Sequence, residues 1–293
     1  MKIARYRHRG KECYGALRDQ TVLCLPFLAK RMKADLPETI EAFIAEPDAE
    51  KAAETLLARA KPGDLAAVSA PLDEVTLQAP IAFPPKILCL GRNYVDHSAE
   101  MSALPPDEPI IFIKPRTTII GPQEKIVKPA FVRELDYEGE LAVVIGRKAK
   151  NVSVEEAPRV IFGYMVFDDV SARDFQFKDG QWTRGKSFDT FAPTGPCMVT
   201  KTQLPDTRNL QLRTWVNGEL RQNASTRNMW LGVSQIVHHL SRVMTLEPCD
   251  IIATGTPSGV GFAMKPPNFL RHGDVVRIEI EGIGTLENQV EEA

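Results

Sequence analysis

The amino-acid sequence predicts a mixed, β-rich fold, with a small α/β unit ahead of a larger unit made mainly of strands. Two observations lead to this prediction. Short apolar or alternating runs bounded by turn-forming residues recur along the chain, which is typical of strands. Helical periodicity is confined to a few segments, without the regular strand–helix alternation of a doubly wound sheet. Near residue 80 the pattern changes from a few strands and helices to mainly strands, so we predict domains at residues 1–80 and 81–293.

The first unit is predicted to begin with strands and to continue with helices. Polar turns separate three strand-like runs, which are Ile3–Tyr6, Cys13–Leu17 and Val22–Leu25. Two helices follow at Ile40–Ile44 and about Asp48–Ala60, where apolar residues share one stripe. The segment Lys61-Pro62-Gly63-Asp64 has the breaker chemistry that ends the second helix. We identify no catalytic cluster in this unit.

The second unit is predicted to carry most of the strands. An extended segment at Val75–Ala82 leads into it, and Asn217-Gly218 indicates a hairpin turn. One segment, Val233–Val243, has the period of an amphipathic helix. The predicted strands are Lys86–Leu90, Ile110–Ile113, Leu135–Ile145, Phe162–Phe167, Cys197–Thr200, Leu212–Val216, Ile251–Thr254 and Val275–Ile280.

Composition and charge limit the classes of partner and location. Lys plus Arg number 36 and Asp plus Glu 38, so the net charge of −2 predicts no nucleic-acid or membrane-surface partner. The N-terminus lacks the apolar region of a signal peptide, and no run approaches the roughly 18 apolar residues of a membrane span. Five dispersed cysteines without a C-x-x-C motif predict neither a disulfide framework nor a structural zinc site. We therefore expect a cytoplasmic protein.

The first candidate site lies at Glu138 and Glu140. On a strand, residues two apart point to the same face, so both carboxylates would project together beside an apolar run. Such a pair is costly, because like charges repel and burial disfavours ionisation. A divalent cation with oxygen ligands would relieve that cost. The alternative is an exposed strand face, which explains most Glu-x-Glu pairs.

A third carboxylate, Asp169, follows the strand predicted at Phe162–Phe167. A strand end is a suitable place for a metal ligand, so Asp169 could join the two glutamates. The simpler alternative is that Asp169 or Ser171 caps the short helix predicted to follow. Spacing alone favours neither interpretation.

His97 and Glu100 form a second kind of candidate. If a helix begins at Asn93 or Asp96, the two side chains lie three residues apart on one helix face. A carboxylate partner raises the basicity of an imidazole and fixes its tautomer, which suits a general base. The Pro-rich segment Met101–Pro109 that follows could act as a lid. A surface His–Glu pair is the commoner alternative.

Two further segments could contact a substrate. Lys186 could hold an anionic group or an enolate oxygen. The segment Thr254–Gly261 is rich in glycine and allows close approach of backbone N–H donors. It has neither P-loop nor dinucleotide-binding spacing, so it predicts no nucleotide site. A tight structural turn is the alternative.

Taken in order, these segments resemble the fumarylacetoacetate hydrolase superfamily. The resemblance covers about residues 84–290. Five motifs occur in the order of the family, and together they are far more specific than any one of them. The residues ahead of it resemble the small N-terminal domain of longer members. The five motifs are Gly91-Arg92-Asn93-Tyr94-x-x-His97-x-x-Glu100, Glu138-x-Glu140, Asp169-x-x-Ala172-Arg173-Asp174-x-Gln176, Gly185-Lys186-Ser187 and Thr254-Gly255-Thr256-Pro257-x-Gly259-Val260-Gly261.

The resemblance implies a fold, a cofactor and a set of site residues. In that family the catalytic domain is a β-sandwich or roll, usually in a homodimer, and three carboxylates bind Mg²⁺ or Mn²⁺. By position, the metal ligands correspond to Glu138, Glu140 and Asp169, the catalytic residues to His97, Glu100 and Lys186, and the substrate contacts to Arg173, Gln176 and Thr256.

The implied substrate is a small 2-oxo acid, converted through an enolate that the bound cation stabilises. The leading expectation is cleavage of a C–C bond, by hydrolysis of an acylpyruvate-type acid or by decarboxylation of an oxaloacetate-type acid. The alternatives are isomerisation of 2-hydroxyhepta-2,4-diene-1,7-dioate or another tautomerisation, and hydrolysis of a 2,4-dioxo-3-deoxy sugar acid. A non-catalytic metabolite-binding protein is a distant alternative, against which the intact site residues speak.

Overall fold

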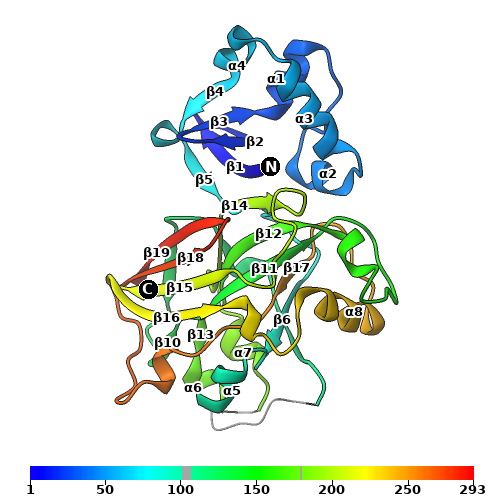
Figure 1. Ribbon diagram of the computed structural model, residues 1–293. Helices are drawn as coiled ribbons and strands as arrows, with labels where there is room; N and C mark the ends of the chain where they lie inside the picture. Colours follow the sequence, from blue (N-terminus) through cyan, green and yellow to red (C-terminus); the bar gives the residue numbers. More distant parts are fainter. Residues whose placement is uncertain (101–106, 179) are drawn as a thin grey trace.

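The computed structural model describes residues 1–100, 107–178 and 180–293, apart from the side chains of residues 98 and 99 (Figure 1). Most of the predicted lid, Met101–Pro109, lies outside the described residues. The described chain forms two large sheets and several short helices, so the mixed, β-rich fold is confirmed. None of its described helices combines the length and apolar character that a membrane crossing needs.

The first 80 residues form a layer of strands with helices packed beside it (Figure 1). Leu25, Leu28 and Phe43 are fully buried in the core of this layer. The three predicted strands and both predicted helices are confirmed. The strands are β1 (Lys2–His8), β2 (Lys11–Arg18), β3 (Thr21–Cys24), β4 (Ser69–Pro71) and β5 (Thr76–Gln78), and the helices are α1 (Leu25–Met32), α2 (Ile40–Ala45), α3 (Ala49–Arg59) and α4 (Pro62–Val68).

The sequence prediction misses two helices in this layer. Leu25 begins α1 instead of ending a strand, because the proline that follows it suits the first turn of a helix. The segment Lys61–Asp64 ends α3 as predicted, but it also begins α4. Pro62 lies in the first helical turn, and the Asp64 carboxylate accepts a hydrogen bond from the backbone N–H of Lys61 at 3.3 Å.

One disulfide joins Cys13 on β2 to Cys24 on β3. The prediction of no disulfide is therefore wrong for this pair, whereas the other three cysteines are free and buried. The two strands are antiparallel with Gly15 opposite Cys24, so Cys13 is a diagonal neighbour of Cys24. Only the strand register brings these two residues together, and their spacing in the sequence does not reveal it.

The larger sheet continues from this layer into the rest of the chain. Lys2 pairs with Val199 and Ile3 with Met198, which joins β1 antiparallel to β14. The strand order is β4-β3-β2-β1-β14-β12-β11-β17-β6-β7, with β5 beside β1 and β8 beside β14. The boundary at residue 80 stays a prediction. The added strands are β6 (Ile87–Gly91), β7 (Ile110–Lys114), β8 (Ile119–Ile120), β11 (Gly139–Ile145), β12 (Ile161–Asp168), β14 (Ala192–Thr200) and β17 (Ile251–Ala253).

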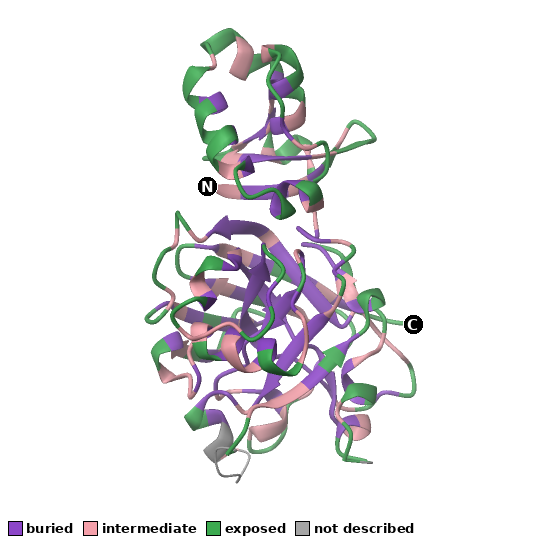
Figure 2. Cartoon of the chain, turned by 90° about the vertical axis from the view of Figure 1, so that its right-hand side faces the viewer, coloured by how far each residue is buried: buried purple, intermediate pink, exposed green. Residues whose placement is uncertain are grey.

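The second sheet packs against the larger one through buried apolar side chains. Leu212, Ile278 and Leu286 are among these side chains. Much of the strand ribbon is purple in Figure 2, which marks buried residues. The predicted hairpin is confirmed, since Asn217 and Gly218 both have positive φ in the turn from β15 to β16. In order, this sheet contains β16 (Glu219–Ser225), β15 (Gln211–Val216), β18 (Val275–Ile280), β19 (Gly284–Glu292) and β9 (Lys125–Lys128).

The strands predicted for the second unit are all present, and α8 (Val233–Val243) has the predicted bounds. The segment Leu135–Ile145 is divided, however, because β10 (Leu135–Asp136) leaves the main sheet and pairs with β13 (Ser171–Ala172). Three short helices, α5 (Val95–Glu100), α6 (Arg173–Gln176) and α7 (Thr183–Lys186), lie near this pair at the lower end of Figure 1. Short 3₁₀ turns occur at Leu72–Glu74, Arg116–Thr118, Ala157–Arg159, Thr226–Asn228 and Gly261–Ala263.

Candidate active site and metal centre

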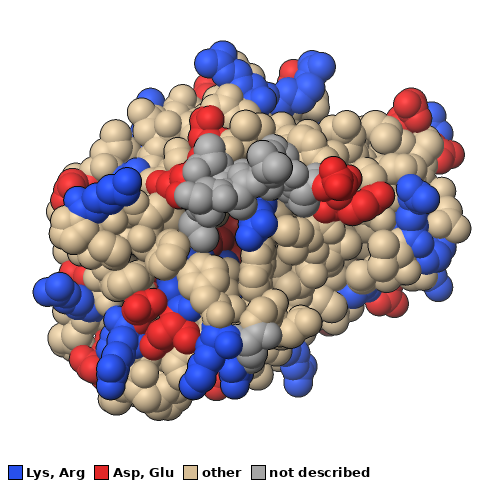
Figure 3. Space-filling view, turned by 90° about the horizontal axis from the view of Figure 1, so that it is seen from below, with Lys and Arg blue, Asp and Glu red and all other residues tan. Residues whose placement is uncertain are grey.

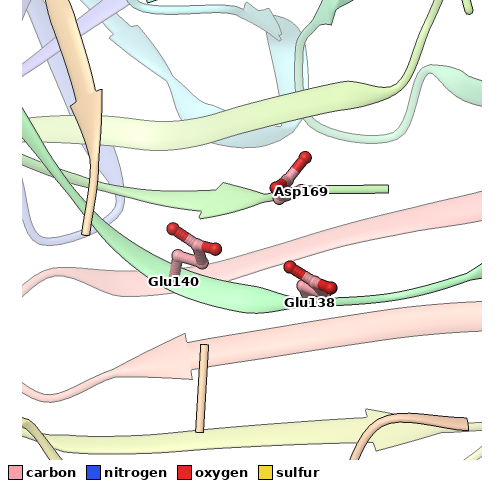
Figure 4. Close-up of side chains that lie close together, drawn as sticks. All are labelled: Glu138, Glu140 and Asp169. Atoms are coloured by element: carbon pink, nitrogen blue, oxygen red, sulfur yellow. The ribbon is translucent and has the colours of Figure 1, made fainter. Parts of the chain in front are cut away.

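Three carboxylates converge where β11 and β12 meet. Glu138 immediately precedes β11, Glu140 lies within it, and Asp169 follows β12. The backbone N–H of Asp169 donates to the Glu138 carbonyl oxygen at 2.9 Å, which holds the two strand ends side by side. All three residues are buried, and one ligand oxygen from each lies within 4.8 Å of the others (Figure 4). The geometry rules out an exposed strand face, whereas the ligand role stays a prediction.

Three buried cations surround two of these carboxylates. Lys186 Nζ lies 2.7 Å from Asp169 Oδ2 and 2.9 Å from Glu138 Oε2. Lys114 Nζ lies 2.5 Å from the other oxygen of Asp169, and Arg173 lies 2.6 Å from Glu138 Oε1. Burial opposes the ionisation of Glu138, but the charges of Lys186 and Arg173 hold its pKa at about 2. Glu138 and Asp169 are thus compensated by the protein's own side chains.

Glu140 has a different environment. Its carboxylate accepts a hydrogen bond from the backbone N–H of Gly255 at 2.7 Å. Burial, together with the charges of Asp169 and Glu138, raises the pKa of Glu140 well above its usual range. Ionised Glu140 therefore needs additional positive charge, and a divalent cation with carboxylate ligands would supply it. This donor set fits Mg²⁺ or Mn²⁺.

The helix-capping alternative for Asp169 and Ser171 is wrong. Helix α6 has Ala172 at its N-cap position, without a hydrogen bond from a capping side chain. Both carboxylate oxygens of Asp169 instead accept bonds from lysines. The Ser171 hydroxyl donates to the backbone oxygen of Asp169 at 2.8 Å. Asp169 is thus held in place by charge, as a strand-end carboxylate.

His97 and Glu100 lie together on α5. The helix begins at Val95, and His97 Nδ1 is 3.2 Å from Glu100 Oε2, as expected for residues three apart. The Asn93 side chain donates to the carbonyl oxygens of Leu231 and Thr254. Only 7% of His97 is exposed. A surface His–Glu pair is therefore ruled out, although the catalytic role stays a prediction.

The predicted substrate contacts are all buried. Arg173 Nε donates to Asp136 Oδ2 at 2.9 Å, and its NH1 group donates to Gln176 Oε1 at 2.9 Å. The Thr256 hydroxyl donates to the Gly139 carbonyl oxygen at 3.0 Å and accepts a bond from a glutamine amide. These bonds fix the three side chains on the elements that carry the carboxylates. Contact with a substrate stays a prediction.

One pocket brings most of these groups together. Its polar wall includes His97, Glu138 and Lys186, and Phe112 and Trp182 stand edge to face at 5.7 Å on its apolar wall. Figure 3 shows the face of the molecule beside α5, α6 and α7, where acidic and basic side chains lie around a hollow. The remaining lining residues are Leu90, Gly91, Arg92, Arg173, Gln176, Phe177 and Thr256.

Sequence reasoning missed Lys114 and Asp136. Lys114 follows four apolar residues at the end of β7, and its side chain is fully buried against Asp169. Asp136 accepts hydrogen bonds from Arg173 and from the backbone N–H groups of Gly261 at 2.8 Å and Phe262 at 3.0 Å. A lysine that ends an apolar strand is ordinarily exposed, so the sequence carries no distinct signal for Lys114. The signal for Asp136 is its position two residues before Glu138.

Comparisons with known proteins agree with this geometry. Residues 86–291 match the family described as "Fumarylacetoacetate (FAA) hydrolase C-terminal". The chain is 48% identical over 218 residues to "Oxaloacetate tautomerase fahd2, mitochondrial" of Xenopus laevis. The matched residues cover 74% of this chain and 68% of that protein.

Among the solved structures that match the full length of this chain are two enzymes with named activities. The 2-hydroxyhepta-2,4-diene-1,7-dioate isomerase from Mycobacterium marinum is 37% identical, with a TM-score of 0.78 and 98% of its own chain covered. The maleylpyruvate hydrolase from Sphingobium sp. SYK-6, in complex with manganese (II) ion and pyruvate, is 31% identical, with a TM-score of 0.81 and all of its chain covered.

Proposed function

The chain belongs to the fumarylacetoacetate hydrolase family, and from this premise we propose that it is a divalent-cation-dependent tautomerase of a small 2-oxo acid such as oxaloacetate. The relative named as an oxaloacetate tautomerase supports the substrate. The neighbouring structure named as an isomerase supports the class of reaction. Tautomerisation was an alternative on sequence alone, and these names favour it over C–C cleavage.

The observation that carries the proposal is that one pocket holds a candidate base beside the carboxylate cluster. His97, Glu138 and Lys186 line the same pocket. Tautomerisation needs a group that moves a proton at C3 and a positive environment for the oxygen at C2. The imidazole of His97 and the ammonium of Lys186 meet these two needs.

The proposed cation ligands are Glu138, Glu140 and Asp169. When Mg²⁺ or Mn²⁺ is bound there, it supplies a Lewis acid that polarises the 2-keto group. The manganese ion in the neighbouring maleylpyruvate hydrolase supports this assignment. Lys114 and Lys186 orient Asp169 from both of its oxygens, so the ligand is fixed before any cation binds.

The chain's own side chains then move and stabilise charge. With Nδ1–H of His97 donating to Glu100, Nε2 is the atom that takes the C3 proton in the keto-to-enol direction. In that direction the C2 oxygen takes up a proton from solvent and His97 afterwards releases its proton to solvent, and both transfers reverse in the other direction. Lys186 neutralises the charge that develops on the C2 oxygen. Gln176 and Thr256, on the pocket wall, bind the substrate carboxylate, Gln176 through its side-chain amide N–H and Thr256 through its backbone N–H, because the Thr256 hydroxyl already donates to Gly139.

The test is an assay of enol-to-keto conversion of oxaloacetate, followed by the ultraviolet absorbance of the enol, with Mg²⁺, with Mn²⁺ and with EDTA. Acetylpyruvate, fumarylpyruvate and a 2,4-dioxo sugar acid are assayed in parallel, with identification of products. We expect cation-dependent conversion of oxaloacetate. No turnover of any of these acids with either cation would favour the non-catalytic alternative.

Hydrolytic C–C cleavage is the second candidate, favoured by the neighbouring structure named as a maleylpyruvate hydrolase. There His97 would deprotonate the attacking water. His97→Ala should lower both tautomerisation and hydrolysis by about 10²- to 10⁴-fold, while decarboxylation of oxaloacetate, which needs no activated water, is spared. His238→Ala is the control, since His238 on α8 contacts the Val152 carbonyl at 2.7 Å. Equal loss of all three activities would contradict this division of roles.

Three further predictions accompany the proposal: the domains at residues 1–80 and 81–293, a homodimer, and a cytoplasmic location. Light scattering of the purified protein tests the dimer. The mitochondrial names of several relatives make localisation by microscopy a useful experiment.

A further inference from the structure

We propose that Tyr137 is a positioning residue for the His97–Glu100 pair and that it acts through the backbone of Gly259. The inference rests on the proposed role of His97 and Glu100 in proton transfer. Tyr137 stands one residue before the candidate ligand Glu138 and is 1% exposed. It was not a candidate on sequence, because an aromatic residue beside an apolar strand normally serves the core.

Three hydrogen bonds, the first two joined by the backbone of Gly259, connect Tyr137 to the imidazole. The Tyr137 hydroxyl donates to the Gly259 carbonyl oxygen at 2.8 Å. The backbone N–H of Gly259 donates to Glu100 Oε1 at 3.0 Å. The other oxygen of Glu100 lies 3.2 Å from His97 Nδ1. The two oxygens of Glu100 therefore have separate partners, one on the glycine-rich segment and one on its own helix.

The backbone of Gly259 has a conformation that requires glycine. Gly259 has a φ of +104°, and a Cβ atom added there would lie 2.1 Å from the backbone oxygen of Arg221. Any other residue would be strained and would clash with backbone, so glycine is required at this position. Glycine is also the least restrained residue, and the bond from Tyr137 supplies the missing restraint.

The stretch of chain that contains Tyr137 holds the glycine-rich segment at a second point. Asp136, next to Tyr137, accepts the backbone N–H groups of Gly261 and Phe262. Two consecutive residues therefore tie residues 259–262 to the strand segment that continues into Glu138 and Glu140. The bonds set the position of the imidazole relative to the carboxylate cluster, although the two groups lie on different elements.

Loss of the Tyr137 hydroxyl should slow proton transfer without weakening binding. The Gly259 carbonyl would lose a buried partner, and rotation about φ and ψ of Gly259 could then turn its N–H away from Glu100. Among the described residues, those that line the pocket do not include Tyr137. KM for the substrate and the affinity for Mn²⁺ should therefore stay near their wild-type values, while kcat falls.

The test compares Tyr137→Phe with Tyr14→Phe. Tyr14 is a matched control, because it is 2% exposed and its hydroxyl also donates to a backbone carbonyl, that of Pro37, in the N-terminal layer. We expect Tyr137→Phe to lower kcat by about five- to tenfold, the effect of one buried hydrogen bond. KM and Mn²⁺ affinity, measured by calorimetry, should stay within about twofold, and Tyr14→Phe should leave kcat unchanged.

A double-mutant cycle with Glu100→Gln shows through which residue Tyr137 acts. If it acts through Glu100, then Tyr137→Phe should have no further effect on kcat in the Glu100→Gln background. Multiplicative losses, or a wild-type kcat in Tyr137→Phe, would overturn the inference. Hydrogen exchange of residues 93–100 gives an independent readout, and it should rise in Tyr137→Phe alone. Wild-type activity in Glu100→Gln, by contrast, would overturn the proposed proton-transfer pair itself.

Discussion

The N-terminal layer and the carboxylate cluster bury opposite kinds of side chain. The core of the layer is apolar, and its ion pairs, such as Arg31–Asp64, lie at the surface. The cluster instead buries Lys114, Glu140 and Lys186 with their partners. Burying charge costs stability even when the charges are paired. The difference fits a layer built for stability and a cluster that retains costly charged groups for its proposed chemistry.

Glu140→Gln, a change in the carboxylate cluster, should have the largest effect on activity. It removes the candidate ligand whose charge burial most disfavours, so cation-dependent activity should fall at least about 10³-fold. The amide can still accept the bond from the Gly255 N–H. The protein in EDTA should therefore melt no lower than wild type, as measured by circular dichroism.

Glu12→Gln provides the matched change in the N-terminal layer. Glu12 pairs with Arg5 and Arg7 on neighbouring strands and is largely exposed. Activity should stay within about twofold, because exposed ion pairs contribute little. If Glu140→Gln kept wild-type activity and wild-type affinity for Mn²⁺, Glu140 would not be a ligand of the cation.

Lys114→Met should have the next largest effect. It leaves one oxygen of Asp169 without its buried cation, which should lower the free energy of unfolding by about 3–5 kcal/mol in EDTA. Mn²⁺ should recover part of this loss, because the cation replaces the missing positive charge. Urea unfolding with and without Mn²⁺ measures both quantities.

Arg31→Met in the N-terminal layer is the contrast to Lys114→Met. The Arg31–Asp64 pair is partly exposed, so its loss should leave the free energy of unfolding almost unchanged, with or without Mn²⁺. Equal losses in the two variants would mean that the buried pair contributes no more than a surface pair. The distinction between the two regions would then fail.

The elements of the larger unit differ in how far the sequence predicts them. Helix α8 was predicted with its observed bounds, because Val233, Ile236 and Leu240 are spaced so that one face is buried. Strand β19 was missed, because Asn288 occupies a core-facing position and interrupts the apolar alternation. Its side chain donates to the carbonyl oxygens of Gly121 and Glu124, so a polar residue is stable there.

In the cluster, the carboxylates, the His97–Glu100 pair, Lys186 and Arg173 could be identified by motif, whereas other groups that hold them, such as Lys114, could not. Lys114 lies 55 residues from Asp169 in the sequence, and only the fold brings their side chains together. The same holds for Tyr137 and Gly259, which are 122 residues apart. Local patterns predict which residues carry chemistry, and long-range register determines what holds them.

The smallest effect on activity should come from replacing Cys13 and Cys24 together by alanine. The disulfide closes a short loop within the N-terminal layer, so its removal should lower the free energy of unfolding by about 3 kcal/mol. Tautomerase activity should stay within about twofold, because these cysteines lie on β2 and β3, away from the strands that carry the carboxylates.

Thiol titration of the unfolded, unreduced wild type should give three free cysteines, and the variant should also give three. A large loss of activity in the folded variant would mean that the layer and the cluster are coupled through the β1–β14 pairing. If the variant instead kept its activity while losing stability, the disulfide would contribute to the stability of the N-terminal layer alone. Proton transfer would then depend on the buried charged residues of the cluster and not on the layer.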